Sequence, residues 1–302
     1  MNESEVLIPS GAVELSGTYS APEGDGGPHV AILMIAGSGP LDRDGNHKRL
    51  PLAVSKDLSD VFVARGFSTL RYDKRGVGES GGDYMTAGFH DELDDARAAL
   101  SWLADRDDVF SVIPVGHSAG SLHAAELAAE GLASGGAVLL AHTVKTGRET
   151  LVWQAKEIGE TVPAWIKKVM ALFGTSIEKQ QGKALTKIAS SEADVVRIQG
   201  QRTNGKWMRE FLTYDPRSAL ERVATPVLAL TGSKDVQVDP GDIGHISEIL
   251  GSVGVARLVD DVDHILRHEP AATSNPKYYK RQIRKPIDSA VTAAIMEWIE
   301  AR

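Results

Sequence analysis

The most informative stretch of this 302-residue chain is Val112-Ile113-Pro114-Val115-Gly116-His117-Ser118-Ala119-Gly120, continued by Ser121-Leu122-His123-Ala124-Ala125-Glu126-Leu127-Ala128. A short apolar run precedes a Gly-x-Ser-x-Gly motif, and helix-forming residues follow it. This order predicts a buried strand, a sharp turn and a helix, with the hydroxyl of Ser118 exposed at the carboxyl end of the strand. The two glycines allow a strained backbone at such a turn. Ser118 is therefore the candidate nucleophile.

A second match to the same motif is Gly78-Glu79-Ser80-Gly81-Gly82. Glycine makes up about a tenth of the chain, so the motif alone is a weak signal. No helical pattern follows Ser80 directly. We interpret Ser80 as a loop serine and favour Ser118.

Other parts of the chain alternate between short β-rich apolar runs and amphipathic helical patterns. The runs are residues 29–36, 68–73, 111–116, 137–141, 226–231 and 256–259. This alternation predicts an α/β fold, with a mostly parallel central sheet and helices on both faces. Residues 13–19 also alternate like a strand, and a glycine-rich turn at 22–28 follows them. We expect these residues to form a hairpin with the next strand.

Residues 146–217 interrupt the alternation between two strands. They carry helical patterns and six aromatic side chains, namely Trp153, Trp165, Phe173, Trp207, Phe211 and Tyr214. A structureless loop of this length is improbable inside a compact domain. We predict a helical cap at 146–217, inserted into a core made of 1–145 and 218–302. Its aromatic side chains face either the core or a substrate pocket.

A serine hydroxyl needs a neighbouring base to become a good nucleophile. After a Gly-x-Ser-x-Gly serine on a sheet of this kind, an acid and then a histidine follow in chain order, each after a later strand. Asp235 comes just after the strand at 226–231, and Asp239 is the alternative on the same loop. His264 follows the strand at 256–259, with His268 as its nearest competitor. His142 ends another strand, where it could line the pocket.

An oxyanion hole requires two backbone N–H groups. One is expected from Ala119, directly after the nucleophile, and the other from the loop after the first long strand. That loop is Ala36-Gly37-Ser38-Gly39-Pro40, and we favour the N–H of Ser38. The loop lacks the Gly-Lys-Ser/Thr ending of a phosphate-binding loop.

Composition excludes several classes of protein. The chain has no cysteine, which rules out disulfides, thiolate catalysis and zinc–thiolate sites. Its net charge of −8 is scattered, unlike the basic patch of a nucleic-acid-binding protein. The first residues are acidic and no apolar leader follows, and the longest apolar runs are too short to span a bilayer. We expect a cytoplasmic enzyme without nucleic-acid or membrane partners. The sequence does not determine its oligomeric state.

The chain resembles the bacterial α/β-hydrolases described as serine aminopeptidase-like or dienelactone-hydrolase-like, which include many carboxylesterases. The resemblance covers most of the core, through segments at residues 37–45, 73–80, 116–120, 211–216, 232–235 and 263–264. It implies an α/β-hydrolase fold, catalytic roles for Ser118, Asp235 and His264, and oxyanion roles for Ser38 and Ala119.

Two of these segments, 37–45 and 73–80, carry further expectations. The resemblance implies that residues 73–80 form a structural turn. Many relatives have His-Gly in the oxyanion loop where this chain has Ala36-Gly37, which affects the stability of the loop more than the chemistry. We expect Asp42-Arg43-Asp44 to form an ion network that holds this loop, with direct substrate binding by Arg43 as the alternative.

The resulting hypothesis is a carboxylesterase-type serine hydrolase that cleaves small-molecule esters through an acyl-enzyme on Ser118. This mechanism implies no cofactor and no metal. Two enzyme alternatives use the same three residues: a peptidase or amidase, and a thioesterase or acyltransferase. A non-catalytic ligand receptor is the alternative outside enzymes.

Overall fold

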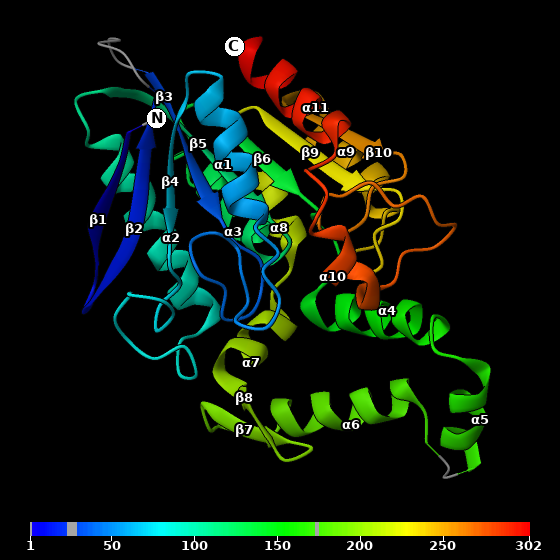
Figure 1. Cartoon of the computed structure of the whole chain (residues 1–302). Helices are drawn as coiled ribbons and strands as arrows, with labels where there is room; N and C mark the ends of the chain where they lie inside the picture. Colours follow the sequence, from blue (N-terminus) through cyan, green and yellow to red (C-terminus); the bar gives the residue numbers. More distant parts are fainter. Residues whose placement is uncertain (1, 23–28, 173–174) are drawn as a thin grey trace.

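The computed structural model describes residues 2–22, 29–172 and 175–302. An eight-stranded sheet runs through its centre in the order β1-β2-β4-β3-β5-β6-β9-β10 (Figure 1). The strands are β1 (Asn2–Ser10), β2 (Val13–Ala21), β3 (His29–Ile35), β4 (Ser68–Tyr72), β5 (Val109–His117), β6 (Ala137–Leu140), β9 (Val227–Gly232) and β10 (Gly254–Val259). All pairs from β4 to β10 are parallel, whereas β1 and β2 pair antiparallel at one edge. The predicted mostly parallel sheet is confirmed.

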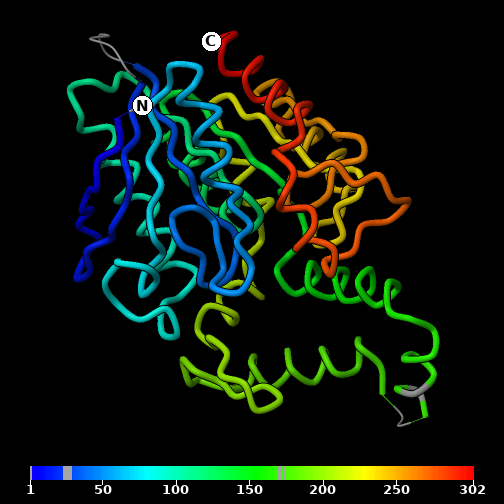
Figure 2. Tube along the Cα trace, viewed as in Figure 1, coloured from blue at the N-terminus to red at the C-terminus, as the bar shows by residue number. Residues whose placement is uncertain are grey.

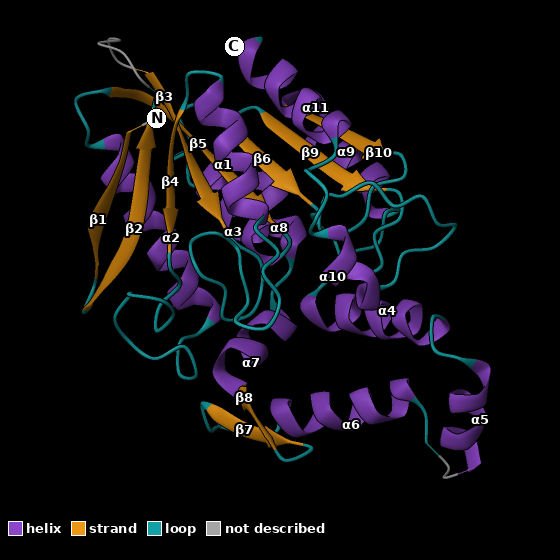
Figure 3. Ribbon diagram, in the orientation of Figure 1, coloured by secondary structure: helices purple, strands orange, loops and turns teal. Residues whose placement is uncertain are grey.

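Helices cover both faces of the sheet (Figure 3). They include α1 (Val54–Ala64), α2 (Phe89–Ala104), α3 (Ala119–Ala129), α8 (Pro216–Arg222), α9 (Asp242–Leu250), the short α10 (Tyr279–Gln282) and α11 (Ser289–Glu300). Side chains of β3 alternate between two apolar layers: Leu33 packs in the layer of α2, α3 and α9, whereas Ile32 packs in the layer of α1 and α11. Because both layers exclude water, these strands are apolar throughout.

The N-terminal edge differs from the predicted hairpin. β2 pairs with β1 and with β4, and β3 lies on the far side of β4, so residues 13–19 form no hairpin with the next strand. The turn predicted at 22–28 lies almost entirely outside the described residues. β1 was not predicted, because an edge strand that is largely exposed needs few apolar residues to pair.

Between β6 and β9 the chain leaves the sheet beyond the carboxyl ends of the parallel strands (Figures 1 and 2). It forms α4 (Gly147–Glu160), α5 (Ala164–Leu172), α6 (Ile177–Ala189), the hairpin β7 (Val195–Ile198) and β8 (Gln201–Asn204), and α7 (Gly205–Thr213). α8 then returns to the core, where Ala219 and Leu220 are buried. We refer to α4–α7 with the hairpin as the cap segment; its division from the core at 146 and 217 stays a prediction.

The helices are too short or too polar to cross a membrane in the part of the chain that the structure describes. Within the described ranges, none of them has an apolar stretch that would reach across a lipid bilayer.

The turn between β5 and α3 depends on close backbone contacts. A side-chain carbon at Gly116 would overlap the carbonyl oxygen of Gly120, and one at Gly120 would overlap the carbonyl oxygen of Ile35 at the end of β3. The first turn of α3 therefore rests directly on two neighbouring strand ends. Only glycine fits at either position.

We predict that Gly120→Ala lowers the free energy of unfolding by at least about 1–3 kcal/mol, because the added methyl group has no space in this contact. Gly182→Ala is the matched control. Gly182 is also helical, and its new methyl would meet nothing within 4 Å. It should stabilise α6 by about 0.5–1 kcal/mol. Urea unfolding followed by circular dichroism measures both, and equal effects would contradict the steric explanation.

Candidate active site

Ser118 lies at the turn between β5 and α3 in a strained backbone conformation. Its φ is 54° and its ψ is −124°, a region that non-glycine residues rarely adopt. Such strain costs of order 1–3 kcal/mol and must be held by the surroundings. The N–H of Ser118 donates to the carbonyl of Leu140 (2.9 Å) on the next strand. The hydroxyl of Ser121 donates to the carbonyl of Ser118 (2.6 Å).

A buried histidine supports this turn from behind. The Ser121 hydroxyl has a single proton, which it gives to the carbonyl of Ser118, so the contact between Ser121 Oγ and His142 Nδ1 (2.9 Å) must be donated by Nδ1–H. Burial lowers the pKa of His142 to about 3. The ring is therefore neutral and structural. The idea that His142 lines the pocket is wrong, since its neighbours Ala141 and Thr143 form the wall instead.

Asp235 and His264 meet at the carboxyl edge of the sheet. His264 Nδ1 lies 2.7 Å from Asp235 Oδ2, and both side chains are buried. A carboxylate only accepts hydrogen bonds, so Nδ1–H donates, and in the neutral ring Nε2 is the nitrogen that carries the lone pair. The other carboxylate oxygen, Asp235 Oδ1, accepts the N–H groups of Gln237 (2.7 Å) and Val238 (2.9 Å). The acid is thus fixed by its own loop while it orients the ring.

The alternative acid and base are engaged elsewhere. Asp239 pairs with Lys145 (2.9 Å) and accepts the N–H of Gly241. The side chain of His268 is about half exposed and lies 3.6 Å from Asp288.

His117, directly before the nucleophile, anchors the loop that carries His264. Its Nε2 lies 2.8 Å from the carbonyl oxygen of His264, and a carbonyl only accepts, so the ring donates. Burial, with the neighbouring His264 ring adding to it, lowers the pKa of His117 to about 4. His117 is therefore an uncharged ring whose hydrogen bond connects the turn at Ser118 to the loop of His264. The sequence pattern did not indicate this role.

The two expected oxyanion donors flank Ser118. Ala119 opens α3, where the N–H groups of a first turn have no partner inside the helix. Ser38 belongs to the loop after β3, and a side-chain carbon at the preceding Gly37 would lie 3.2 Å from the Cβ of Ser118. Ser38, Ser118 and Ala119 line one cavity. The loop is thus close enough to bring a second donor to a bound carbonyl.

The loop after β3 is held by ion pairs. The guanidinium of Arg43 lies 2.8 Å from Asp73 Oδ2 and also contacts Glu5 and Glu79. Asp44 pairs with the buried Arg71. The expected ion network is confirmed for Arg43 and Asp44, whereas Asp42 Oδ1 accepts the backbone N–H groups of Asp44 (3.0 Å) and Asn46 (2.8 Å). Arg43 lines neither of the two cavities at Ser118, so direct substrate binding by Arg43 finds no support there.

Ser80 is a buried structural serine. Its hydroxyl donates to the carbonyl of Asp73 (2.7 Å) and accepts the N–H of Ser16 (2.9 Å). The first bond closes the turn after β4, and the second connects this turn to β2.

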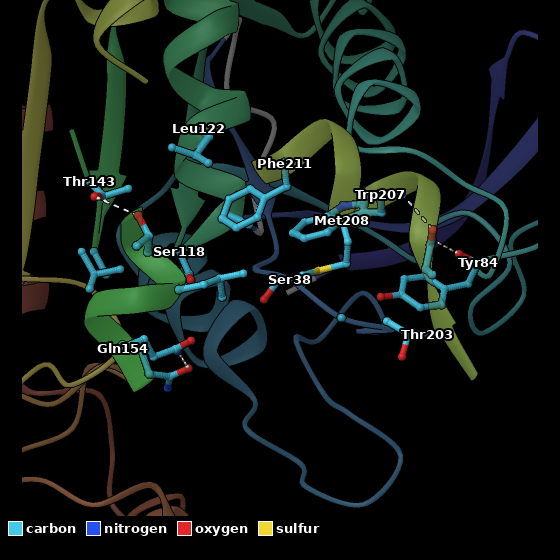
Figure 4. Close-up of a pocket in the computed structure, with 18 residues that line it drawn as sticks. Ser38, Tyr84, Ser118, Leu122, Thr143, Gln154, Thr203, Trp207, Met208 and Phe211 are labelled. Atoms are coloured by element: carbon cyan, nitrogen blue, oxygen red, sulfur yellow. Dashed lines mark hydrogen bonds between the residues drawn. The ribbon is translucent and has the colours of Figure 1, made fainter. Parts of the chain in front are cut away.

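Two cavities meet at Ser118, and both also contact Ser38 and Gln237. The first, about 270 Å³, lies beneath the cap segment, and Figure 4 shows Trp207, Met208 and Phe211 around it. The second, about 290 Å³, is lined by His264 together with apolar side chains such as Leu50, Leu52 and Ile265. None of the described residues that line either cavity is Asp, Glu, Lys or Arg.

Comparisons with known proteins identify the family of the chain. The family model described as "Serine aminopeptidase, S33" matches residues 53–271. The chain belongs to this family. Over 288 residues it is 26% identical to the esterase EstD of Thermotoga maritima, covering 94% of this chain and 65% of EstD. The chain therefore spans just under two thirds of the length of that relative.

Solved structures show the same fold as this S33 family member. Est1E from Butyrivibrio proteoclasticus, in its complex with ferulic acid, superposes with a TM-score of 0.64 at 17% identity, over 98% of this chain and 99% of Est1E. The α/β hydrolase GrgF from Penicillium sp. sh18 gives 0.66 at 14% identity, over 100% of this chain and 99% of GrgF. The fold is therefore the α/β-hydrolase fold.

The aromatic side chains of the cap segment of this S33 family member have different surroundings. Trp207 and Phe211 stack on each other, with ring centroids 4.8 Å apart, and line the first cavity. Tyr214 packs against Phe89 and donates its hydroxyl to Glu126 (2.9 Å). Trp165 is 68% exposed, Trp153 lines a separate surface hollow, and Phe173 lies outside the described residues. Helical periodicity could not separate these surroundings.

Among the described side chains, no group of three or more His, Asp or Glu residues is placed to hold a metal ion.

We predict that stability falls as acid protonates His142. Its pKa is lowered from 6.5 to about 3 in the folded protein, so its contribution is complete above pH 6.5 and is lost as the pH falls towards 3. His142→Asn keeps a donor for Ser121 but cannot take up a proton. Between pH 7 and 4.5, urea unfolding should show wild type losing roughly 2–3 kcal/mol more than this variant. Parallel losses would contradict the neutral structural role.

Proposed function

We propose that this protein hydrolyses carboxylic esters of uncharged small molecules through an acyl-enzyme on Ser118. The observation that carries the proposal is the placement of Ser118, on a strained turn, beside the cavity that His264 also lines. The carboxylate of Asp235 holds the Nδ1–H of His264, which leaves Nε2 as the free acceptor. In this proposal Ser118 is the nucleophile, His264 the general base and Asp235 the group that orients it.

The reaction follows from these positions. Ser118 Oγ attacks the ester carbonyl while His264 Nε2 accepts the hydroxyl proton, and the N–H groups of Ser38 and Ala119 stabilise the tetrahedral oxyanion. The carbon–oxygen bond to the alcohol then breaks, and the alcohol leaves with the proton from His264. Water, deprotonated by His264, attacks the acyl-enzyme. The acid is released and Ser118 recovers its proton.

The lack of charged side chains in the described lining of the cavities favours esters over peptides that are bound by their free amino terminus. A peptidase that selects a free amino terminus needs a carboxylate near the α-ammonium group, because a buried unpaired charge is costly. No acidic side chain is found among the described residues lining either cavity. The same walls offer no cation for the phosphates of a carrier thioester. EstD, which is named an esterase, supports the same choice.

Other parts of the hypothesis are proposals of the same kind. The substrate is a small molecule, with no nucleic-acid or membrane partner and no cofactor. A cytoplasmic location completes the proposal, and fractionation of cells with an antibody against the chain would test it.

We predict that Ser118→Ala abolishes hydrolysis of a short p-nitrophenyl ester, because the covalent route is lost. Ser80→Ala should retain the activity, at the cost of about 1–3 kcal/mol of stability from two lost buried hydrogen bonds. Mass spectrometry after treatment with a fluorophosphonate should find the label on Ser118. A label on another residue would overturn the assignment.

We predict that Asp235→Asn lowers kcat by about 10³–10⁴-fold, because an amide that donates to His264 favours the wrong tautomer. Asp239→Asn is the matched control on the same loop and should stay within tenfold of wild type, since Asp239 contacts Lys145 and not the imidazole. Steady-state kinetics on one ester measures both. The reverse order of effects would identify Asp239 as the acid.

A further inference from the structure

The side chain of Gln237 lies where the two cavities at Ser118 meet. Ser38, Ser118 and Gln237 are the residues that both cavities share. Ser118 and Ser38 supply the nucleophile and a proposed oxyanion donor, so any carbonyl undergoing attack sits at this junction. Gln237 is the shared residue that has no part in the proposed bond-making steps.

Hydrogen bonds hold Gln237 from both sides of the junction. Its Nε2 donates to the hydroxyl oxygen of Tyr279 (3.0 Å), which lines the second cavity. Its Oε1 accepts from Nε2 of Gln154 (3.3 Å), which belongs to α4 of the cap segment and lines the first cavity. The dashed line beside Gln154 in Figure 4 is this second bond. The amide of Gln237 therefore bridges the cap segment and the core across the site.

We propose that Gln237 is a specificity-determining partition that separates the two halves of the substrate. The acyl group occupies the cavity beneath the cap segment, and the alcohol occupies the cavity beside His264. This inference rests on the ester hydrolysis proposed above.

The position of the proton donor determines which half of the ester enters which cavity. His264 must protonate the alcohol oxygen as it leaves, and His264 lines the second cavity and not the first. The alcohol therefore extends into the second cavity. The acyl carbon stays bonded to Ser118, so its chain extends into the first, between Leu151, Trp207 and Phe211.

The size and charge of the cavities define the substrate class. An apolar cavity of about 150 Å³ holds benzene, and these cavities measure about 270 and 290 Å³. Each has room for a single ring or a short branched chain. Because the described lining carries no formal charge apart from His264 when protonated, both halves of the ester are uncharged. The substrate class is a neutral ester with two compact apolar groups.

The partition is tested by measuring kcat/KM for a grid of esters in which the size of the acyl group and the size of the alcohol group are varied separately; none of them contains a p-nitrophenyl group. In wild type the preference for acyl size should not depend on the alcohol, and the preference for alcohol size should not depend on the acyl group. Gln237→Ala removes the bridging amide but keeps the backbone N–H that binds Asp235. It should raise kcat/KM for esters with one oversized half by at least tenfold relative to the smallest ester. Gln199→Ala is the matched control: its amide donates to Gln180 at the surface of the cap segment and lines neither cavity, so it should change this ratio less than threefold.

A second pair of variants tests the direction of binding. Leu151→Trp narrows the first cavity and should reduce kcat/KM at least tenfold for large acyl groups, whatever the alcohol. Leu50→Trp narrows the second cavity and should do the same for large alcohols, whatever the acyl group. The opposite pattern would overturn the assignment of the two halves. This pair also keeps the proposal testable if Gln237→Ala does not fold.

The outcomes separate the partition from the proposed function. The partition alone is overturned if wild type turns over these esters and is labelled at Ser118 by a fluorophosphonate, while Gln237→Ala changes kcat/KM by the same factor for every ester of the grid. A folded wild type that hydrolyses no ester of the grid overturns the proposed function and the partition with it.

Discussion

The structure around the site depends on the strained backbone of Ser118. A positive φ at a non-glycine residue is unfavourable, so the conformation persists only because several contacts fix it at once. Its N–H binds the next strand, its carbonyl binds Ser121, and Gly116 and Gly120 allow α3 to press against the ends of β5 and β3. These contacts place the hydroxyl beyond the sheet edge and aim the first turn of α3 at the same point. The proposed nucleophile and one proposed oxyanion donor thus come from a single local constraint.

Three buried histidines surround this turn, and each has its proton on a defined nitrogen. His142 donates from Nδ1 to Ser121, His117 donates from Nε2 to the carbonyl of His264, and His264 donates from Nδ1 to Asp235. Burial lowers the pKa of His142 and of His117, so these two rings remain neutral supports at physiological pH. His117 and His264 both line the second cavity with Ser118, and of these two rings His264 has Nε2 free of the bonds just described. The hydrogen-bond pattern therefore separates one candidate base from two structural rings of the same residue type.

The cap segment and the acid loop together shape what the site can bind. Trp207 and Phe211 close the first cavity from the cap side, while the loop after β9 contributes Gln237 to both cavities. Charged groups nearby are paired away from the cavities, as Arg43 is with Asp73 and Lys145 with Asp239. In the proposed function, an uncharged cleft over the proposed nucleophile suits neutral esters better than substrates that carry an ammonium or a phosphate.

Local periodicity and chain order were enough to predict the strand–turn–helix at Ser118, the parallel sheet, and the positions of Asp235 and His264 after strand ends. The pairing of β2 with β1 and β4, the roles of His117 and His142, and the place of Gln237 between two cavities became visible only in the folded chain. Those features arise from contacts between residues far apart in the chain, such as His117 and His264 at a separation of 147 positions, which no local pattern records. An exposed edge strand and a buried polar contact both lack the apolar periodicity that makes a core strand visible in a sequence.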